Sequence, residues 1–330
     1  MIKIIAIALP ILLILSACGS QQDVFMPPTS ARAADVQLIL AVDLSLEPVF
    51  FSAAEDFAAR ASAISDGELS IHVEWLYNPS QALEHGDIQM AFLKSDDQSL
   101  PDIYFEAVSM PFLYSNYSHF TNIINNTRIL NMITHGSLDS IEARPIAGFY
   151  RPANRLVTIW PLEEYHFLSE AMIALNPQSR SSDALQAIGA TILPIYSPQE
   201  RAELIMSGDI QGAEFTLAEL LDIQWIGQEL HVTDIGHDLS PVWLFADDDT
   251  LRSLTPLQRA YITESSAYLF NTIDGSFLAE DRRYRTSLEG YNFLFTGYFA
   301  PIRLEMLHRL ESMPEYLVSS AQRFMLEVVN

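Results

Sequence analysis

The chain has 330 residues, of which 42 are Asp or Glu and 18 are Lys or Arg, so its formal net charge at pH 7 is -24. This charge argues against a nucleic-acid partner, because phosphate binding needs clustered Lys and Arg. A single cysteine excludes an intramolecular disulfide and a cysteine-based metal site, and the length is sufficient for two ordinary domains.

The beginning of the chain has the pattern of an export signal followed by a tether. The apolar run Ile4–Leu15 is shorter than the about 20 residues that span a membrane. It leads into Leu-Ser-Ala-Cys, which resembles a bacterial lipobox and implies a signal peptide at residues 1–17 and a diacylglycerol anchor on Cys18. Residues 18–34 are then the lipidated cysteine and a flexible tether. We expect an exported protein, periplasmic or at the cell surface, that is anchored to a membrane; a lone Cys can also be a small buried residue.

Strand-like and helix-like patterns alternate between residues 36 and 93. A near-continuous apolar run at Val36–Val42 predicts a strand buried on both faces of a sheet. The order strand, helix, strand, helix, strand is typical of a parallel α/β sheet. The expected strands are Val36–Val42, Glu68–Trp75 and Ile88–Leu93, and the expected helices run from Pro48 to near Asp66 and over Pro79–His85.

The same alternation returns after Asp183. Ser197, Pro198 and Glu200 have the spacing of an N-cap, a first-turn proline and a capping box. The expected elements are a helix to Ile188 closed by Gly189, a strand at Thr191–Ile195, a helix from Ser197 to Ser207 and a strand at Ile210–Glu214.

The string Gly-Asp-Ile-Gln-x-Ala occurs at Gly86–Ala91 and again at Gly208–Ala213, each time between an expected helix and an expected strand. We interpret it as the same corner in two related halves, although strings this short can also recur by chance. Residues just past the carboxyl ends of parallel strands face the ligand crevice in such folds. The candidates on this ground are Lys94, Ser95 and Asp96 in one half and Glu214, Phe215 and Thr216 in the other.

The remaining segments predict connections and helices. Residues 105–113 and 145–160 are expected to be loop-and-strand connections. Thr255-Pro256-Leu257-Gln258 is a second capping box and opens a long helix toward Phe270, and a strand is expected at Tyr291–Phe295.

Motifs of catalysis are missing from the sequence. It has no Gly-x-Ser-x-Gly elbow, no His-Glu-x-x-His, and no glycine-rich fingerprint for phosphate or dinucleotide. Eight His are scattered without metal-ligand spacing. The pairs Asp96-Asp97 and Glu163-Glu164 suit general acid–base work in principle, but adjacent carboxylates in an acidic chain are typical of a solvated surface. We expect no enzyme, no cofactor and no metal.

Several segments, in this order, resemble the solute receptors of tripartite ATP-independent periplasmic (TRAP) transporters, of the DctP type. The resemblance covers the chain after Ala34, and its pieces are Leu69–Ala91, Met110–Leu113, Ala184–Ala190, Ser197–Glu214, His237 and Leu254-Thr255-Pro256. It implies an α/β, periplasmic-binding-protein-like fold: two lobes, each with a mixed, mainly parallel sheet, that close on a small organic acid in a central cleft. It also implies delivery of the solute to integral membrane subunits.

The resemblance also implies a division into lobes. Residues 35–155 with about 242–275 would form lobe I, and residues 156–241 with about 276–330 would form lobe II. In the resembled receptors an Arg at the start of the second lobe forks onto the ligand carboxylate. Ala174 stands at that position, and Phe215 replaces a ligand-binding Asn. Both departures favour an atypical ligand, less acidic or more apolar than a dicarboxylate.

The predicted ligand-binding residues are Arg155, Arg151, Phe215, Glu214, Lys94, Asp43 and Trp160. Arg155 is the first choice among the cations near the expected cleft, with a salt bridge between lobes as the alternative role. Phe215 and Trp160 would line an apolar pocket or belong to a core. Asp43 would contact the ligand or mark the entry to a helix.

Two other functions are compatible with the sequence. One is an orphan binding lipoprotein that acts as a sensor or scaffold. The other is an anchored hydrolase with an unrecognised pair of carboxylates.

Overall fold

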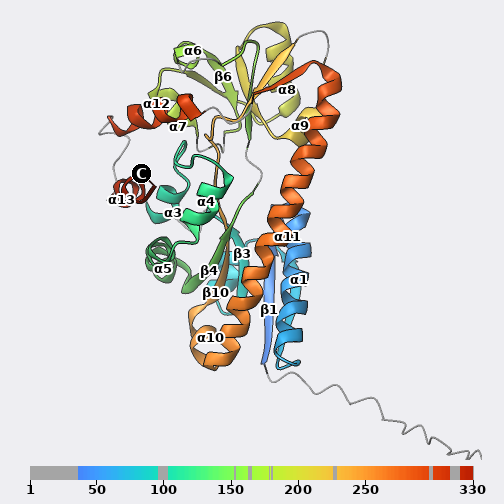
Figure 1. The fold of residues 1–330 in the computed structure, drawn as a ribbon, viewed down its shortest axis with the longest axis vertical. Helices are drawn as coiled ribbons and strands as arrows, with labels where there is room; N and C mark the ends of the chain where they lie inside the picture. The colour runs from blue at the N-terminus through green and yellow to red at the C-terminus, as the bar shows by residue number, and fades with distance from the viewer. Residues whose placement is uncertain are drawn as a thin grey trace, which may run out of the picture. The chain divides into compact units, whose positions relative to one another are not determined.

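The structure, a computed structural model, describes residues 36–95, 103–151, 154–162, 166–177, 179, 181–225, 229–296, 300–312 and 320–329. The predicted signal peptide, Cys18 and the tether lie outside these residues, as do Asp96, Asp97, Glu163 and Glu164. Residues 34–330 form one unit by their contacts. Within this unit the described strands form two sheets (Figure 1).

The first sheet has the strand order β2-β1-β3-β10-β4. The central strand β1 (Val36–Asp43) is parallel to β2 (Leu69–Leu76) and to β3 (Met90–Lys94). Between β3 and β4 (Ala143–Phe149) lies β10 (Val242–Asp247), which is antiparallel to both and joins this sheet from far along the chain.

Helices cover both faces of the first sheet, which explains the continuous apolar run of β1. Leu40 and Val42 pack with α1 (Pro48–Ile64) and α11 (Pro256–Leu288). Ala41, on the opposite face, belongs to a core with the helices that follow β2 and β3. Those helices are α2 (Pro79–Glu84), α3 (Ile103–Val108), α4 (Tyr117–Ile124), α5 (Thr127–Ile141) and, near the end of the chain, α13 (Ser320–Val329).

The second sheet has the order β11-β9-β5-β8-β6-β7. Its strands β6, β7 and β8 are parallel, whereas β5 is antiparallel to both β8 and β9. The strands are β5 (Arg155–Thr158), β6 (Met172–Leu175), β7 (Thr191–Pro194), β8 (Gly212–Phe215), β9 (Leu230–Thr233) and β11 (Phe293–Thr296). The remaining elements are α6 (His166–Ser169), α7 (Ser181–Ala187), α8 (Pro198–Ser207), α9 (Leu217–Asp222), α10 (Asp248–Ser253), η1 (Glu289–Tyr291) and α12 (Ala300–Glu311). The predicted α/β class with two mixed sheets is confirmed.

The duplicated string forms the same corner in both sheets. Gly86 and Gly208 end their helices with φ of 74° and 81°, which favours glycine. The Gln that follows in each copy pairs its backbone and its side chain with one residue of the neighbouring strand. Gln89 Oε1 accepts from the Ile39 N–H at 3.0 Å, and Gln211 Oε1 accepts from the Met172 N–H at 2.9 Å. The two copies of the string are therefore equivalent in structure as well as in sequence.

The long helix α11 serves both sheets. Its capping box is formed, because Thr255 Oγ1 accepts from the Gln258 N–H at 3.2 Å and Gln258 Oε1 accepts from the Thr255 N–H at 2.9 Å. Its 33 residues correspond to about 50 Å at 1.5 Å per residue. It contacts α1 and β4 beside the first sheet and α9 beside the second (Figure 1, orange).

Two sequence predictions need correction. Residues 103–108 form the helix α3 rather than a loop or strand, since Phe105, Ala107 and Val108 bury one helical face in the core and Tyr114 Oη donates to the Val108 carbonyl at 2.6 Å. The helix from Pro256 continues past Phe270 to Leu288, because apolar positions such as Ile273, Phe277 and Leu288 remain buried against both sheets.

Candidate functional site: a cavity at the strand ends

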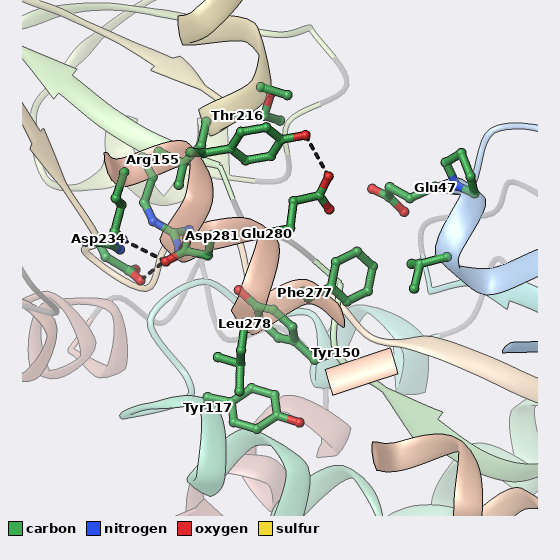
Figure 2. A pocket seen from close by; sticks show the side chains of 16 residues that line it. Glu47, Tyr117, Tyr150, Arg155, Thr216, Asp234, Phe277, Leu278, Glu280 and Asp281 are labelled. Carbon is green, nitrogen blue, oxygen red and sulfur yellow. Dashed lines mark hydrogen bonds and ion pairs between the residues drawn. The ribbon is translucent and has the colours of Figure 1, made fainter. Parts of the chain in front are cut away.

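A cavity of about 700 Å³ lies where chain segments leave the strands of both sheets (Figure 2). Three segments of the first sheet's half line it: Glu47–Val49 at the start of α1, Tyr117 of α4, and Tyr150 directly after β4. This volume is in the range of ordinary small-molecule sites.

The other wall comes from the second sheet and from α11. Arg155 begins β5, Thr216–Ala218 follow β8 and open α9, and Asp234 follows β9. One face of α11 contributes six residues, namely Phe277, Leu278, Glu280, Asp281, Tyr284 and Arg285. Strand ends converge here, as the position of crevices in α/β folds predicts.

Arg155 is the most buried charged group of this cavity, with 5 % of its surface exposed. Its guanidinium Nη2 lies 3.3 Å from Asp281 Oδ1 and 3.6 Å from Asp234 Oδ2. Burial by itself would lower the pKa of Arg155, but Asp234, Tyr150 and Asp281 outweigh it and raise the pKa above its ordinary value. Arg155 therefore stays charged and connects β5 to α11.

A second arginine of the cavity is engaged as well. Arg285 Nε donates to Asp281 Oδ2 at 2.7 Å, and its guanidinium lies 5.2 Å from the centre of the Phe295 ring. Asp281 thus accepts from two arginines, one from the second sheet and one from its own helix. The network fixes this part of α11 against β5.

Aromatic rings form a continuous part of the lining. Tyr117 and Tyr150 meet edge to face with centroids 5.1 Å apart, and Tyr150 meets Phe277 at 6.2 Å in the same manner. Tyr117 Oη is buried and has no hydrogen-bond partner of good geometry among the described residues. Burial and the nearby Asp274 carboxyl raise the pKa of Tyr117, so its hydroxyl stays protonated and is a donor.

Near this cavity, a buried polar cluster surrounds Glu214. Glu214 Oε1 accepts from Ser179 Oγ at 3.0 Å and Ser181 Oγ at 3.3 Å, and lies 3.3 Å from His237 Nε2. Burial would raise the pKa of Glu214, but the His237 and serine contacts prevail and lower it. The pKa of the adjacent Asp238 is raised by burial and by the charge of Glu214.

The predicted site residues are distributed unevenly around the cavity. Of the seven, Arg155 lines it, and Arg151 pairs through Nε with Oε1 of the cavity residue Glu47 at 3.3 Å. Thr216, expected past the end of its strand, lines it too. Glu214 lies outside the lining, in the His237 cluster.

Phe215 belongs to the core of the second sheet. Its ring is fully buried, 5.6 Å from the Trp225 ring centre, and the Arg201 guanidinium lies over it at 5.1 Å. Ala174, where the resembled receptors have Arg, is buried in the same core. The alternation of β8 directs Phe215 into this core, which explains why it is not among the lining residues.

Three other predicted residues also lie outside the lining. Asp43 Oδ1 accepts from the Ser45 N–H at 2.7 Å in the turn that precedes α1, which fits the helix-entry role. Lys94 ends β3 opposite Val242. Trp160 packs beside the core on one face of the second sheet, and Ser95 is buried between Pro241 and Trp243.

Sequence reasoning missed most of the lining. Glu47 and Asp234 had a usable signal, since each follows the end of a strand closely. The residues of α11 had none, because polar side chains such as Glu280, Asp281 and Tyr284 on a helix are typical of a solvated face.

The fold of this chain is similar to that of several solved structures. A crystal structure of a TRAP periplasmic solute-binding protein from Rhodobacter sphaeroides, in an apo open form, matches with a TM-score of 0.75 and 15 % identity over 89 % of this chain and 96 % of that chain. The chain has the TRAP solute-binding fold. This confirms the two-lobed architecture that the sequence resemblance implies.

Two further structures with the TRAP solute-binding fold contain a solute. The protein from Roseobacter denitrificans with bound L-galactonate has a TM-score of 0.62 and 19 % identity over 90 % of this chain and 99 % of that one. The protein from Pseudomonas putida F1 with bound D-glucuronate has a TM-score of 0.63 and 17 % identity over 89 % and 96 %. No protein-family model and no curated protein matches the sequence.

The described residues contain neither a metal-binding cluster nor a helix that could span a membrane. No group of three or more His, Cys, Asp or Glu among them has a geometry that would hold a metal ion. None of the helices described has both the length and the apolar character needed to cross a membrane.

Proposed function

We propose that this chain is an extracytoplasmic solute receptor of a TRAP-type transporter. It captures a small organic solute in the cavity at the strand ends and delivers it to integral membrane subunits. The observation that carries the proposal is a cavity of about 700 Å³ lined by segments of both sheets, in a chain with the TRAP solute-binding fold.

Capture would proceed by closure of two lobes. We assign residues 35–155 with about 242–275 to lobe I and residues 156–241 with about 276–330 to lobe II, with two exceptions. The helix α13 belongs to lobe I because it packs in the core of the first sheet, and Arg155 belongs to lobe II because it begins β5. The helix α11 crosses from one to the other, and its residues 277–285 line the cavity. A solute that contacts Glu47 or Tyr117 on one side and Thr216 or Arg155 on the other would favour the closed arrangement.

The location follows from the same reasoning. The neighbours named above are periplasmic solute-binding proteins, which supports export of this chain. We propose an anchor through Cys18 after removal of residues 1–17. Replacing Cys18 by Ser in the full chain should move the protein from the membrane fraction to the soluble fraction. A Cys18→Ser protein that stays membrane-bound after a salt wash contradicts the anchor.

The direct test of the receptor is mass spectrometry of solute carried through gentle purification, followed by calorimetry with that solute. We expect one solute per chain, released by partial unfolding. The absence of any co-purified solute, together with no binding across a broad panel of acids, amines and neutral solutes, would contradict the proposal. A bound solute without transport in cells would favour the orphan sensor or scaffold.

The anchored hydrolase keeps some structural basis, because carboxylates line the cavity. Two of them, Asp234 and Asp281, are however engaged by Arg155, and Asp281 also by Arg285. The neighbours named above are described as solute-binding proteins. We therefore propose a protein without catalytic activity, and turnover of the purified solute by the protein would contradict this.

A further inference from the structure

The cavity has a net negative charge, whereas a site that binds an organic acid needs a positive one. Its lining contains the carboxylates Glu47, Asp234, Glu280 and Asp281 and the guanidiniums Arg155 and Arg285, which leaves a formal charge of -2. Both arginines are already paired with Asp281, and Arg155 also with Asp234. An anionic solute would have to displace these carboxylates or remain beside them.

The two glutamates are less neutralised. Glu280 accepts from Tyr284 Oη at 2.6 Å, and its ion pair with Arg283 at 3.4 Å joins it to a side chain that is 70 % exposed and therefore well screened. Glu47 accepts from Arg151 through Oε1, while its Oε2 is buried without a hydrogen-bond partner among the described residues. A buried carboxylate oxygen of this kind is stabilised by a cationic donor.

The aromatic lining suits the same kind of solute. Tyr117, Tyr150 and Phe277 form an edge-to-face chain, so their ring planes differ. Figure 2 shows these rings together with Glu47 and Glu280 around the cavity. Aromatic faces carry negative charge density and attract ammonium groups, most strongly where water is excluded.

We infer that the cavity binds a small organic cation through its ammonium group, which the aromatic rings and the carboxylates of Glu47 and Glu280 surround. The inference rests on the proposed receptor function and names the class of its solute. It differs from the sugar acids bound in the two solute-containing neighbours named above. An ammonium group on an otherwise neutral solute and one on a zwitterion share this chemistry.

Calorimetry with four probes tests the inference: choline, putrescine, glycine betaine and D-glucuronate. We expect binding of choline or putrescine, weakening as NaCl is raised because salt screens the attraction. Binding of glycine betaine alone would identify a zwitterion as the source of the ammonium group. In each case D-glucuronate should bind at least about a hundredfold more weakly than the ammonium solute.

Matched variants then assign the site. Glu47→Gln and Glu280→Gln keep the side-chain shape and should each weaken ammonium binding about tenfold. Glu264→Gln is the control, since it removes an ion pair with Arg60 of similar length, 3.2 Å, on an exposed surface outside the lining. Tyr117→Leu should weaken choline binding about fivefold, whereas Tyr117→Phe, which keeps the ring, should not. Thermal unfolding of each variant verifies that it is folded.

The outcomes separate the inference from the receptor proposal. Tight binding of D-glucuronate with no ammonium binding, unaffected by Glu47→Gln and Glu280→Gln, overturns the inference and leaves the receptor function intact. If Glu47→Gln and Glu280→Gln both bind the ammonium solute as tightly as the wild type, the assignment of the site to these residues is wrong. Binding of none of the four probes overturns the inference, and it overturns the receptor function as well only if no solute co-purifies and the broad panel of acids, amines and neutral solutes also fails to bind.

Discussion

At the scale of single residues, the balance of charge around Arg155 decides how the cavity is built. The guanidinium is almost completely buried, whereas its partners Asp234 and Asp281 are about one quarter exposed, with side-chain values of 23 % and 30 %. A buried cation of this kind is tolerated because two carboxylates share it. Arg155 is thus both a cavity residue and a structural connection, and the two roles that the sequence left open are not exclusive.

Removal of Arg155 should therefore lower the stability of the folded protein, whatever its effect on binding. Arg155→Ala leaves Asp234 and Asp281 facing each other, and we expect the free energy of unfolding to fall by about 3 kcal/mol. Urea unfolding measures this. Arg60→Ala, which removes an exposed pair, is the control and should cost less than about 1 kcal/mol. Equal losses in the two variants would contradict the role of burial.

Asp274, on α11 beside Tyr117, gives a pH-dependent prediction. Burial raises the pKa of Asp274 above its ordinary value, with the Tyr117 contact opposing. The unfolded chain therefore releases this proton at lower pH than the folded chain, so the stability contribution present below about pH 3.9 is lost as pH rises through the folded pKa. Asp274→Asn avoids this loss and should be more stable than the wild type at pH 7.

The gain from Asp274→Asn should shrink as the pH is lowered toward 4, because Asp274 regains its proton in the folded chain and the unfolded chain approaches its own pKa of about 3.9. Thermal unfolding of both proteins between pH 4 and pH 7 measures it. Asp249→Asn, at a side chain that is 90 % exposed, is the control for the change of charge itself. A gain for Asp274→Asn that is constant across this range would refute the argument.

At the scale of elements, the duplicated corner shows what a short string can predict. Gly, Ile and Gln each have a structural reason: the glycine ends a helix with positive φ, the isoleucines Ile88 and Ile210 are buried, and the glutamines pair with the next strand. Helix caps and buried strands were similarly predictable, since their causes are local. The face of α11 toward the cavity was not, because its cause is tertiary.

The glutamines of the corner provide a test. Gln211→Leu leaves the N–H of Met172 without its acceptor at a partly buried position, and we expect a loss of about 1 to 3 kcal/mol in the free energy of unfolding. Gln89→Leu should cost a similar amount through Ile39. Gln199→Leu, on the exposed surface of α8, is the control and should be nearly neutral. Urea unfolding of the three variants decides whether the two corners are equivalent.

The helix α11 contains a glycine whose substitution should stabilise the protein. Gly275 lies in the helix interior, and a Cβ added there meets nothing within 4 Å. Ala in place of Gly reduces the entropy of the unfolded chain, so Gly275→Ala should raise the free energy of unfolding by about 0.5 to 1 kcal/mol. The contrasting change is Gly148→Ala, whose Cβ would lie 2.8 Å from the Trp243 ring and should destabilise. Thermal unfolding measures both.

At the scale of the whole molecule, the sequence predicted the architecture better than the site. Fold class and the order of most elements follow from periodicity and caps, whereas the cavity depends on which strand ends meet. Thr216 lines the cavity as its place just past a strand end suggests, and Arg155, chosen as a cation near the expected cleft, lines it too. Phe215, one residue before Thr216, lies in the core because one step along a strand changes the face. The -24 charge is a property of this scale too.

That net charge should make stability depend on salt. Carboxylates outnumber cations more than twofold, so their mutual repulsion destabilises the folded state at low ionic strength. Raising NaCl from about 0.02 to 0.5 M shortens the range of this repulsion and should raise the melting temperature. Calorimetry at several salt concentrations measures it. A melting temperature that falls with salt would show that attractive ion pairs such as that of Arg155 dominate.

The position of β10 late in the chain affects how the protein folds during its synthesis. Because β10 lies between β3 and β4, those two strands have no common neighbour until residues 242–247 have been made. The second sheet likewise waits for β11 at residues 293–296. Neither sheet can be complete before these late segments have been synthesised. The nascent chain therefore stays incompletely folded until most of its length, up to residue 296, has been released.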